Sequence, residues 1–318
     1  MRKFFILVSA AVCMMAAMCS CQSDRDVRLL YWNIQNGMWS DQGNNYDNFV
    51  EFVKSQEPDI CVWCEAATIY NDGTADKRTG DKYLPANWDS LAERYGHKYV
   101  YLGGWRDNYP QVITSKFPIR NVKRILGDPE KVIVAHGAGW AQIEVAGKTL
   151  NIVTLHTWPH PFAYLAEDRQ ASAAKREGDS YRAREMELIC NETIGSVASA
   201  KDEYWMMMGD FNSISPIDNF QYNLPLDTCK FFVHNYVRNN TPYLDVIAEK
   251  YPGEFITSNH GQSRIDYVYC TQPLYDCIEN AEILQDGGWL TIYRDPQNLS
   301  NFYHPSDHRP IVVDFKLK

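Results

Sequence analysis

The chain is poor in basic residues compared with acidic ones. Its 318 residues include 31 Lys and Arg against 40 Asp and Glu, which gives a formal net charge of -9. Affinity for long nucleic acid comes mainly from basic contacts to phosphate, so this balance makes long nucleic acid a less favoured partner. It does not exclude a nuclease, because a local basic groove can lie on an acidic protein.

The sequence also lacks internal repeats, tracts of disordered composition and an apolar run long enough to span a bilayer. The most apolar stretch, residues 4–18, is shorter than a membrane-spanning helix and is broken by Ser9. Apolar residues nevertheless make up 45% of the chain and aromatic residues 13%, which is enough to fill a sizeable core. Because no linker or shift in composition follows Val27, we predict one folded domain over residues 27–318.

The N-terminal segment has the pattern of an export signal. Arg2 and Lys3 precede the apolar stretch, and Met18-Cys19-Ser20-Cys21 follows it. We therefore predict a signal peptide over residues 1–20. A small residue before Cys21 resembles the bacterial lipoprotein cleavage box, which makes Cys21 the lipidation site and residues 21–26 a tether, although a plain secretory signal is the alternative. The expected location is outside the cytoplasm, lipid-anchored to a bacterial membrane, either periplasmic or at the cell surface.

The six remaining cysteines are Cys61, Cys64, Cys190, Cys229, Cys270 and Cys277. An exported protein can pair such residues, but the sequence does not determine the pairing. Cys61 and Cys64 fall in a predicted strand, where alternation points their sulfurs to opposite faces. We interpret these two as buried free thiols.

Strand-like and helical segments alternate along the chain. Strands are predicted at residues 27–34, 60–64, 99–102, 112–114, 140–145, 148–155, 204–208, 265–270 and 311–315. Helices are predicted from Tyr46 to Pro58, over residues 243–250, and over residues 168–200 with an interruption at Gly178. The charged part of the last one, residues 169–184, is interpreted as a solvated face. This order indicates an α/β sandwich in which helices cover two packed sheets.

Polar residues stand where the predicted apolar strands begin or end. They are Asn33, Glu65, His156, Asp210, Asp266, Asp307 and His308. Charged side chains are rarely buried without a partner or a metal ion, because their desolvation is costly. If the strand ends converge, these residues form an acidic pocket with two histidines, and its oxygen ligands suit Mg²⁺ or Mn²⁺.

Ordered motifs around these residues resemble those of the endonuclease/exonuclease/phosphatase superfamily. The motifs are Trp32-Asn33-Ile34-Gln35-Asn36, Glu65, Ser115-Lys116-Phe117-Pro118-Ile119, His156, Gly209-Asp210-Phe211-Asn212, Arg264-Ile265-Asp266-Tyr267 and Ser306-Asp307-His308-Arg309-Pro310. The superfamily includes DNase I-like nucleases, sphingomyelinases and inositol polyphosphate 5-phosphatases. The resemblance implies a DNase I-like fold, a four-layer α/β sandwich of two packed mixed sheets flanked by helices.

The resemblance also implies roles for individual residues. Asn33, Glu65 and Asp307 would bind Mg²⁺ or Mn²⁺, and His156, Asp210, Asn212, Asp266 and His308 would be catalytic. His308 is the expected general base that activates water, since its ordinary pKa lies near neutrality. Asp266 is a candidate partner for one of the two histidines, and the sequence leaves open which one and which histidine is the base.

The expected function is metal-dependent hydrolysis of a phosphodiester or phosphomonoester outside the cytoplasm. An extracellular nuclease is one alternative. The other is a non-catalytic surface binding lipoprotein, whose mark would be a lost metal ligand or base. Trp158 and His160 follow His156 and could contact substrate or solvent. His97, His136, His234, His260 and His304 are given no role.

Overall fold

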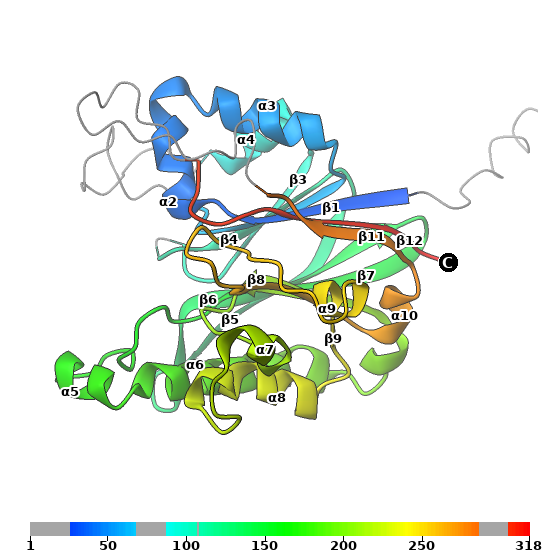
Figure 1. Cartoon of the computed structure of the whole chain (residues 1–318). Coiled ribbons are helices and arrows are strands. Elements are labelled where there is room, and N and C mark those ends of the chain that lie inside the picture. The colour runs from blue at the N-terminus through cyan, green and yellow to red at the C-terminus, as the bar shows by residue number, and fades with distance from the viewer. Residues whose placement is uncertain (1–25, 68–86, 107, 286–304) are drawn as a thin grey trace, which may run out of the picture.

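Two six-stranded sheets packed face to face form the centre of the protein in this computed structural model (Figure 1). The structure describes residues 26–67, 87–106, 108–285 and 305–318. The predicted signal peptide, Cys21 and the tether up to Arg25 lie outside the described residues. Helices cover the outer face of each sheet, so the predicted four-layer α/β sandwich is confirmed.

The first sheet has the order β11-β12-β1-β2-β4-β3. Its strands are β11 (Ile278–Ile283), β12 (Ile311–Lys316), β1 (Asp26–Asn33), β2 (Ile60–Cys64), β4 (Gln111–Ser115) and β3 (Tyr99–Gly103). Only β1 and β2 run parallel, and every other neighbouring pair is antiparallel. The sheet is therefore mixed, and the parallel pair needs a crossover segment between its strands.

The second sheet has the order β5-β6-β7-β8-β10-β9. Its strands are β5 (Ile119–Asp128), β6 (Val132–Val145), β7 (Lys148–His156), β8 (Tyr204–Asp210), β10 (Asp266–Cys270) and β9 (Leu244–Asp245). Here β7 and β8 form the single parallel pair. Each sheet thus contains one parallel pair whose strands end at the same edge.

Six helices of the described residues lie on the two outer faces. Helices α2 (Gln35–Met38), α3 (Asp47–Gln56) and α4 (Trp88–Arg94) lie over the first sheet, whereas α5 (Arg169–Ala174), α6 (Glu177–Glu192) and α8 (Phe232–Asn240) lie over the second. Short helices α7 (Asn219–Tyr222), α9 (Val246–Lys250) and α10 (Gln272–Tyr275) join the later strands. In α3 the predicted stripe of Phe49, Val50 and Val53 is buried. Among the described residues, no helix has the length and apolarity needed to cross a membrane.

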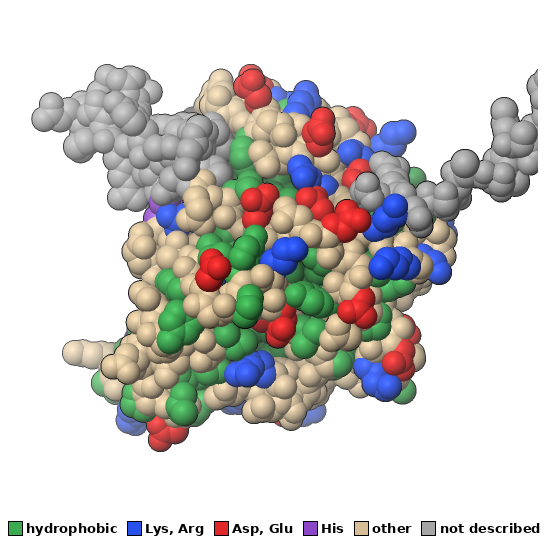
Figure 2. All heavy atoms as spheres, turned by 45° about the vertical axis from the view of Figure 1, so that its right-hand side comes forward, with side chains coloured by type: hydrophobic (Ala, Val, Ile, Leu, Met, Phe, Trp, Pro, Cys, Tyr) green, Lys and Arg blue, Asp and Glu red, His purple; other side chains and the backbone are tan. Residues whose placement is uncertain are grey.

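Three apolar clusters fill the spaces between these layers. The central one packs residues of both sheets together, including Tyr31, Val62, Met208 and Phe315. Two outer clusters join each sheet to its helices. On the described part of the face in Figure 2, acidic and basic side chains are interspersed and do not form a continuous basic stripe.

The structure corrects several predicted elements. Strands β5 and β11 were not predicted, because both lie at sheet edges and expose many polar side chains that interrupt an apolar alternation. The helix predicted to begin at Tyr243 begins at Val246, since Asp245 pairs in strand β9 and accepts a hydrogen bond from the Ala248 N–H as an N-cap.

The long charged helix is broken at Arg176, which has a left-handed φ of 54°, and not at Gly178. The interpretation of residues 169–184 as a solvated face is wrong for Asp179 and Arg182, which are each 3% exposed. They form a buried ion pair with each other, and pairing makes the burial of charge tolerable.

The cysteine prediction is confirmed for the pair in β2. Cys61 belongs to the cluster under the helices, whereas Cys64 belongs to the cluster between the sheets. All six cysteines of the described residues are free thiols, and five of them are buried.

The two sheets approach each other closely where Gly103 of β3 faces Gly139 of β6. A Cβ added to Gly139 would lie 3.0 Å from the Gly103 Cα and 3.0 Å from the Tyr101 ring. We predict that Gly139→Ala destabilises the protein by about 1–3 kcal/mol in urea unfolding, because the sheets must separate locally. The matched control is Gly43→Ala, where the added methyl meets nothing within 4 Å. Equal stability of both variants would contradict this account.

Candidate active site

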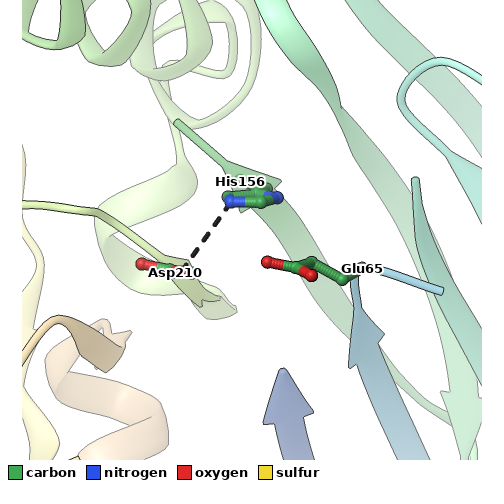
Figure 3. A group of neighbouring side chains, drawn as sticks. All are labelled: Glu65, His156 and Asp210. Carbon is green, nitrogen blue, oxygen red and sulfur yellow. Dashed lines mark ion pairs between the residues drawn. The ribbon is translucent and has the colours of Figure 1, made fainter. Parts of the chain in front are cut away.

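The predicted site residues converge because five strands end or begin at one edge of the sandwich. Glu65 follows β2, His156 ends β7 and Asp210 ends β8 (Figure 3). Asp210 is directly paired with His156 on one side and with Asp266 of β10 on the other. Asn33 ends β1 in the other sheet. Residues far apart in sequence are therefore brought into one cluster.

Donor atoms suited to a metal ion gather around Asp210. One group consists of Glu65, His156 and Asp210, and a second consists of Asp210, Asp266 and His308, each with its atoms within 4.8 Å of one another. Side chains from opposite sheets make the first group, as Figure 3 shows. Its carboxylate oxygens fit a hard divalent cation such as Mg²⁺ or Mn²⁺.

Asn33 links the carboxylates of the two sheets. Its Nδ2 donates to Glu65 Oε1 at 3.3 Å and to Asp210 Oδ2 at 3.1 Å. Its Oδ1 accepts from the Gln35 N–H, and the Asn36 N–H donates to Glu65 Oε2 at 3.0 Å. The predicted metal-binding role of Asn33 stays a prediction. Its amide nitrogen bridges the two carboxylates, whereas a metal ligand would present its amide oxygen.

The partner of Asp266 is His308. Asp266 Oδ2 lies 2.7 Å from His308 Nδ1 and also accepts a hydrogen bond from the Ser258 hydroxyl. The other ring nitrogen of His308, Nε2, lies 3.7 Å from Asp210 Oδ2 and 3.8 Å from Asp307 Oδ1. Arg264, two residues before Asp266, forms buried ion pairs with Asp218 and Asp245.

Burial and neighbouring charges separate the two site histidines. Burial alone would lower the pKa of His308, but Asp266 and Asp210 outweigh it and hold this pKa well above the ordinary value. Burial lowers the pKa of His156, and nearby His136 and His308 lower it further. His156 is thus neutral near pH 7, whereas His308 holds a proton strongly.

The two buried carboxyl groups of the site, Glu65 and Asp210, keep their protons to higher pH than usual. Burial raises the pKa of Glu65 and of Asp210, and their acidic neighbours Asp307 and Asp266 add to the effect. Such a cluster disfavours several simultaneous negative charges and is stabilised by protons or by a cation.

Two predicted site residues have a left-handed backbone that non-glycine residues rarely adopt. Glu65 has a φ of 55° and Asn212 a φ of 44°. The Asn212 N–H donates to Asp210 Oδ1, and its side-chain Nδ2 donates to the Thr157 carbonyl. A strained backbone conformation persists only where surrounding contacts stabilise it. Residues in such conformations concentrate at functional sites.

A pocket of about 510 Å³ opens beside this cluster. Glu65, His156 and Asp307 line one part of it, and the sequence-predicted loop residues Trp158 and His160 line another. The predicted ligand Asp307 is therefore in the same pocket as Glu65, half exposed, and its metal-binding role stays a prediction.

His136 and Glu185 are site residues that the sequence interpretation missed. His136 stacks on His156 with ring centroids 4.3 Å apart, and Glu185 holds the backbone on both sides of this pair. The predicted strand began at Trp140, so His136 fell outside any recognised element. The glycines at 137 and 139 hide the alternation that would have extended the strand.

No family model matches the sequence, and no curated protein matches it either. Solved structures do match. An AP endonuclease from Archaeoglobus fulgidus matches with a TM-score of 0.60 at 16% identity, over 91% of this chain and 99% of that one.

The catalytic domain of human Nocturnin, with bound sulfate, matches with a TM-score of 0.60 at 14% identity, over 92% of this chain and 94% of that one. A 3'-5' exonuclease from Neisseria meningitidis gives 0.58 at 14% identity, over 91% and 99%. The fold that the motif resemblance implied is thus confirmed: the chain has a DNase I-like fold.

Proposed function

We propose that the protein is an exported, metal-dependent hydrolase of phosphate esters. The observation that carries this proposal is the juxtaposition of Glu65 and Asp210 with the Asp266–His308 pair. Carboxylates that suit a divalent cation thereby lie beside a histidine that is oriented to exchange a proton. The DNase I-like fold and the ordered motifs support the same chemistry.

Glu65 would hold the cation together with Asn33 and Asp307, and Asp210 is close enough to share in its binding. When bound, Mg²⁺ or Mn²⁺ supplies positive charge that offsets the charge of the phosphate and of the leaving oxygen. The raised pKa values of Glu65 and Asp210 indicate that their negative charges are destabilised here, so a cation at this position would stabilise them.

His308 would take the proton from the attacking water. The hydrogen bond that the Nδ1–H of His308 donates to Asp266 fixes the ring and leaves Nε2 directed toward Asp210 and the reaction centre. The imidazolium that forms is stabilised by the Asp266 carboxylate, as in other histidine–aspartate pairs. A cation held by Glu65, Asn33 and Asp307 would supply positive charge that disfavours the resting proton of His308, and the ring would then act as the base.

His156, which burial keeps neutral, would donate a hydrogen bond to a non-bridging oxygen or assist the leaving group. Asp210 would orient the water, and Asn212 would turn its amide toward a phosphate oxygen from the start of the next loop.

An extracellular nuclease is a second candidate, because a local basic cluster lies beside the site. Arg176, Arg182 and Lys230 line a cavity of about 190 Å³ that also includes Asn212. Asp179 forms ion pairs with both arginines and reduces the positive charge available there. A non-catalytic surface lipoprotein is less well supported, since each predicted ligand and the base are present.

The proposed hydrolase activity is tested by measuring turnover of the protein and of its variants. We expect Mg²⁺- or Mn²⁺-dependent hydrolysis of bis(p-nitrophenyl) phosphate or p-nitrophenyl phosphate that stops on chelation. His308→Ala should lower kcat by about 10²–10⁴-fold, because general-base catalysis is lost. Asp266→Asn should lower kcat by about 10²-fold or more, since an amide cannot stabilise the imidazolium.

The matched control for Asp266→Asn is Asp276→Asn, an exposed aspartate at the end of α10. It should retain full kcat. Full activity of His308→Ala would remove His308 from the mechanism. Single-stranded DNA, tested in parallel, distinguishes the nuclease: faster cleavage of DNA than of both nitrophenyl esters would favour that candidate.

The pKa shifts predict that metal affinity depends on pH. A carboxyl group with a raised pKa keeps its proton to higher pH, and the cation must displace that proton. We therefore expect the affinity for Mn²⁺, measured by isothermal titration calorimetry, to rise between about pH 6 and about pH 8. Glu65→Gln should weaken binding by at least about tenfold, and Glu51→Gln on the exposed face of α3 should not. An affinity that is constant or falls with pH would contradict this proton competition.

Export and lipid anchoring are part of the proposal and rest on residues 1–26. In a bacterial host grown with labelled palmitate, the protein should carry the label and sediment with membranes. Cys21→Ala should lose both properties because the acyl chains attach at that thiol, and Cys19→Ala should retain them. Labelling of Cys21→Ala would show that another residue carries the lipid or that the predicted cleavage site is misplaced.

A further inference from the structure

A wall of ring side chains lines the pocket next to the proposed metal ligands. His136, His156, Trp158, His160 and Tyr164 share the pocket with Glu65 and Asp307. The rings also contact one another: His136 stacks on His156, and the Trp158 and Tyr164 centroids lie 4.9 Å apart. The wall thus begins at the catalytic histidine and extends away from it along the loop after β7.

The loop that carries most of this wall is held by two buried side chains of α6. Glu185 Oε2 accepts a hydrogen bond from the Trp158 N–H at 2.9 Å, and Arg182 Nη1 donates to the Trp158 carbonyl at 2.8 Å. Arg182 also donates to the His160 carbonyl at 3.0 Å. Both polar backbone groups of Trp158 are therefore bound to the same helix, by residues that are 0% and 3% exposed.

Glu185 also fixes the other half of the histidine stack. Its Oε1 accepts from the Ala135 N–H at 2.7 Å, one residue before His136. One carboxylate thus joins the strand that carries His136 to the loop that follows His156. Burial raises the pKa of this carboxyl to about 8, so its place in the interior is costly and the two amide bonds compensate only in part.

Gly178 allows the loop to lie directly on α6. A Cβ at this position would come within 2.1 Å of the His160 carbonyl oxygen, and the Gly178 N–H donates to the Pro161 carbonyl at 2.9 Å. The Trp158 Nε1 in turn donates to the Phe162 carbonyl at 2.6 Å. An exposed loop held by this many buried polar contacts is pre-organised, which is what a binding surface requires.

The charges around the pocket restrict what the wall can bind. Within the described part of the chain, the pocket lining contains Glu65 and Asp307 and no Lys or Arg. Burial lowers the pKa of His136 to about 4, and burial together with Arg169 and Arg182 lowers that of His160, so these two imidazoles are neutral near pH 7. The described lining offers a second phosphate no Lys or Arg side chain, whereas an uncharged planar ring could stack on the aromatic faces.

We propose that His136, Trp158, His160 and Tyr164 form a subsite for an uncharged planar ring borne by the phosphate ester, with Glu185 and Arg182 as positioning residues. The proposal rests on the phosphoesterase function and adds the class of substrate. The substrate is a phosphate ester in which a neutral aromatic or heteroaromatic group lies close to the phosphorus. The ring packs against the wall while the phosphate reaches Glu65 and His156.

Binding of non-hydrolysable phosphonates tests the subsite without turnover. The dissociation constants of phenylphosphonate, methylphosphonate and 2-(trimethylammonio)ethylphosphonate are measured by calorimetry on the whole protein with Mg²⁺ present. Phenylphosphonate should bind about tenfold more tightly than methylphosphonate, the effect of stacking one ring. Equal affinities would overturn the proposal, and tightest binding of the trimethylammonium compound would assign the wall to a cation instead.

Substitutions test whether Trp158 causes the phenyl preference. Trp158→Ala should reduce the phenyl preference to near one while methylphosphonate affinity is unchanged, and Trp158→Phe should restore most of the preference. Tyr99→Ala, an exposed tyrosine at the start of β3, is the matched surface control and should keep the full preference. A preference that survives Trp158→Ala in a folded protein would place the ring elsewhere.

Glu185→Gln tests the positioning role. The amide retains the size of the side chain but turns a donor toward one of the two backbone N–H groups, so one bond is lost. The affinity for phenylphosphonate should fall more than the affinity for methylphosphonate, so the phenyl preference should decrease. A merely structural role would lower the melting temperature and leave the preference intact.

The two proposals fail separately. Metal-dependent turnover of nitrophenyl esters without a phenyl preference would overturn the subsite alone. A phenyl preference without turnover of any ester would overturn the hydrolase and leave the ring subsite standing.

Discussion

The buried carboxylate of Asp266 joins the two sheets where the site forms. It accepts hydrogen bonds from Tyr31 in β1 at 2.7 Å and from Ser258 at 2.8 Å, and it lies 2.7 Å from the His308 ring. Because a charge that is only 1% exposed must keep its partners, these contacts fix the first sheet, the second sheet and the segment before β12 relative to one another. The separation of the proposed ligands and base depends on this arrangement.

The same edge of the sandwich concentrates negative charge, and this explains the other electrostatic properties of the site. Asp210 lies between two paired neighbours, His156 and Asp266, while Asn33 joins it to Glu65 from the opposite sheet. Burial, with a smaller contribution from Asp266, raises the pKa of Asp210, whereas Asp266 and Asp210 raise the pKa of His308 against the effect of burial. A divalent cation would offset the negative charge of these acidic groups, and its binding would then be coupled to proton release from the site.

Helix α6 connects the core to the surface that would select a substrate. Its apolar residues Met186 and Ile189 pack under the second sheet. Its buried Glu185 and Arg182 hold the loop at Trp158. These charged residues therefore hold a loop that lines the pocket, although their spacing in the sequence resembles that of an exposed helix face. Under the two proposals, the residues at the strand ends would hydrolyse the ester. The loop at Trp158, which α6 holds, would select the class of ester.

The sequence by itself determined the four-layer architecture and the candidate set of site residues, because strand ends are marked locally by a change from apolar to polar residues. Glu65 after β2 and His156 at the end of β7 are examples. It did not determine which histidine pairs with Asp266, nor that Arg264 turns toward Asp218 and Asp245. The roles of His136 and Glu185 were likewise decided only by tertiary packing. Such contacts join residues tens of positions apart, and a side chain's partner there depends on sheet register and burial, which no local pattern records.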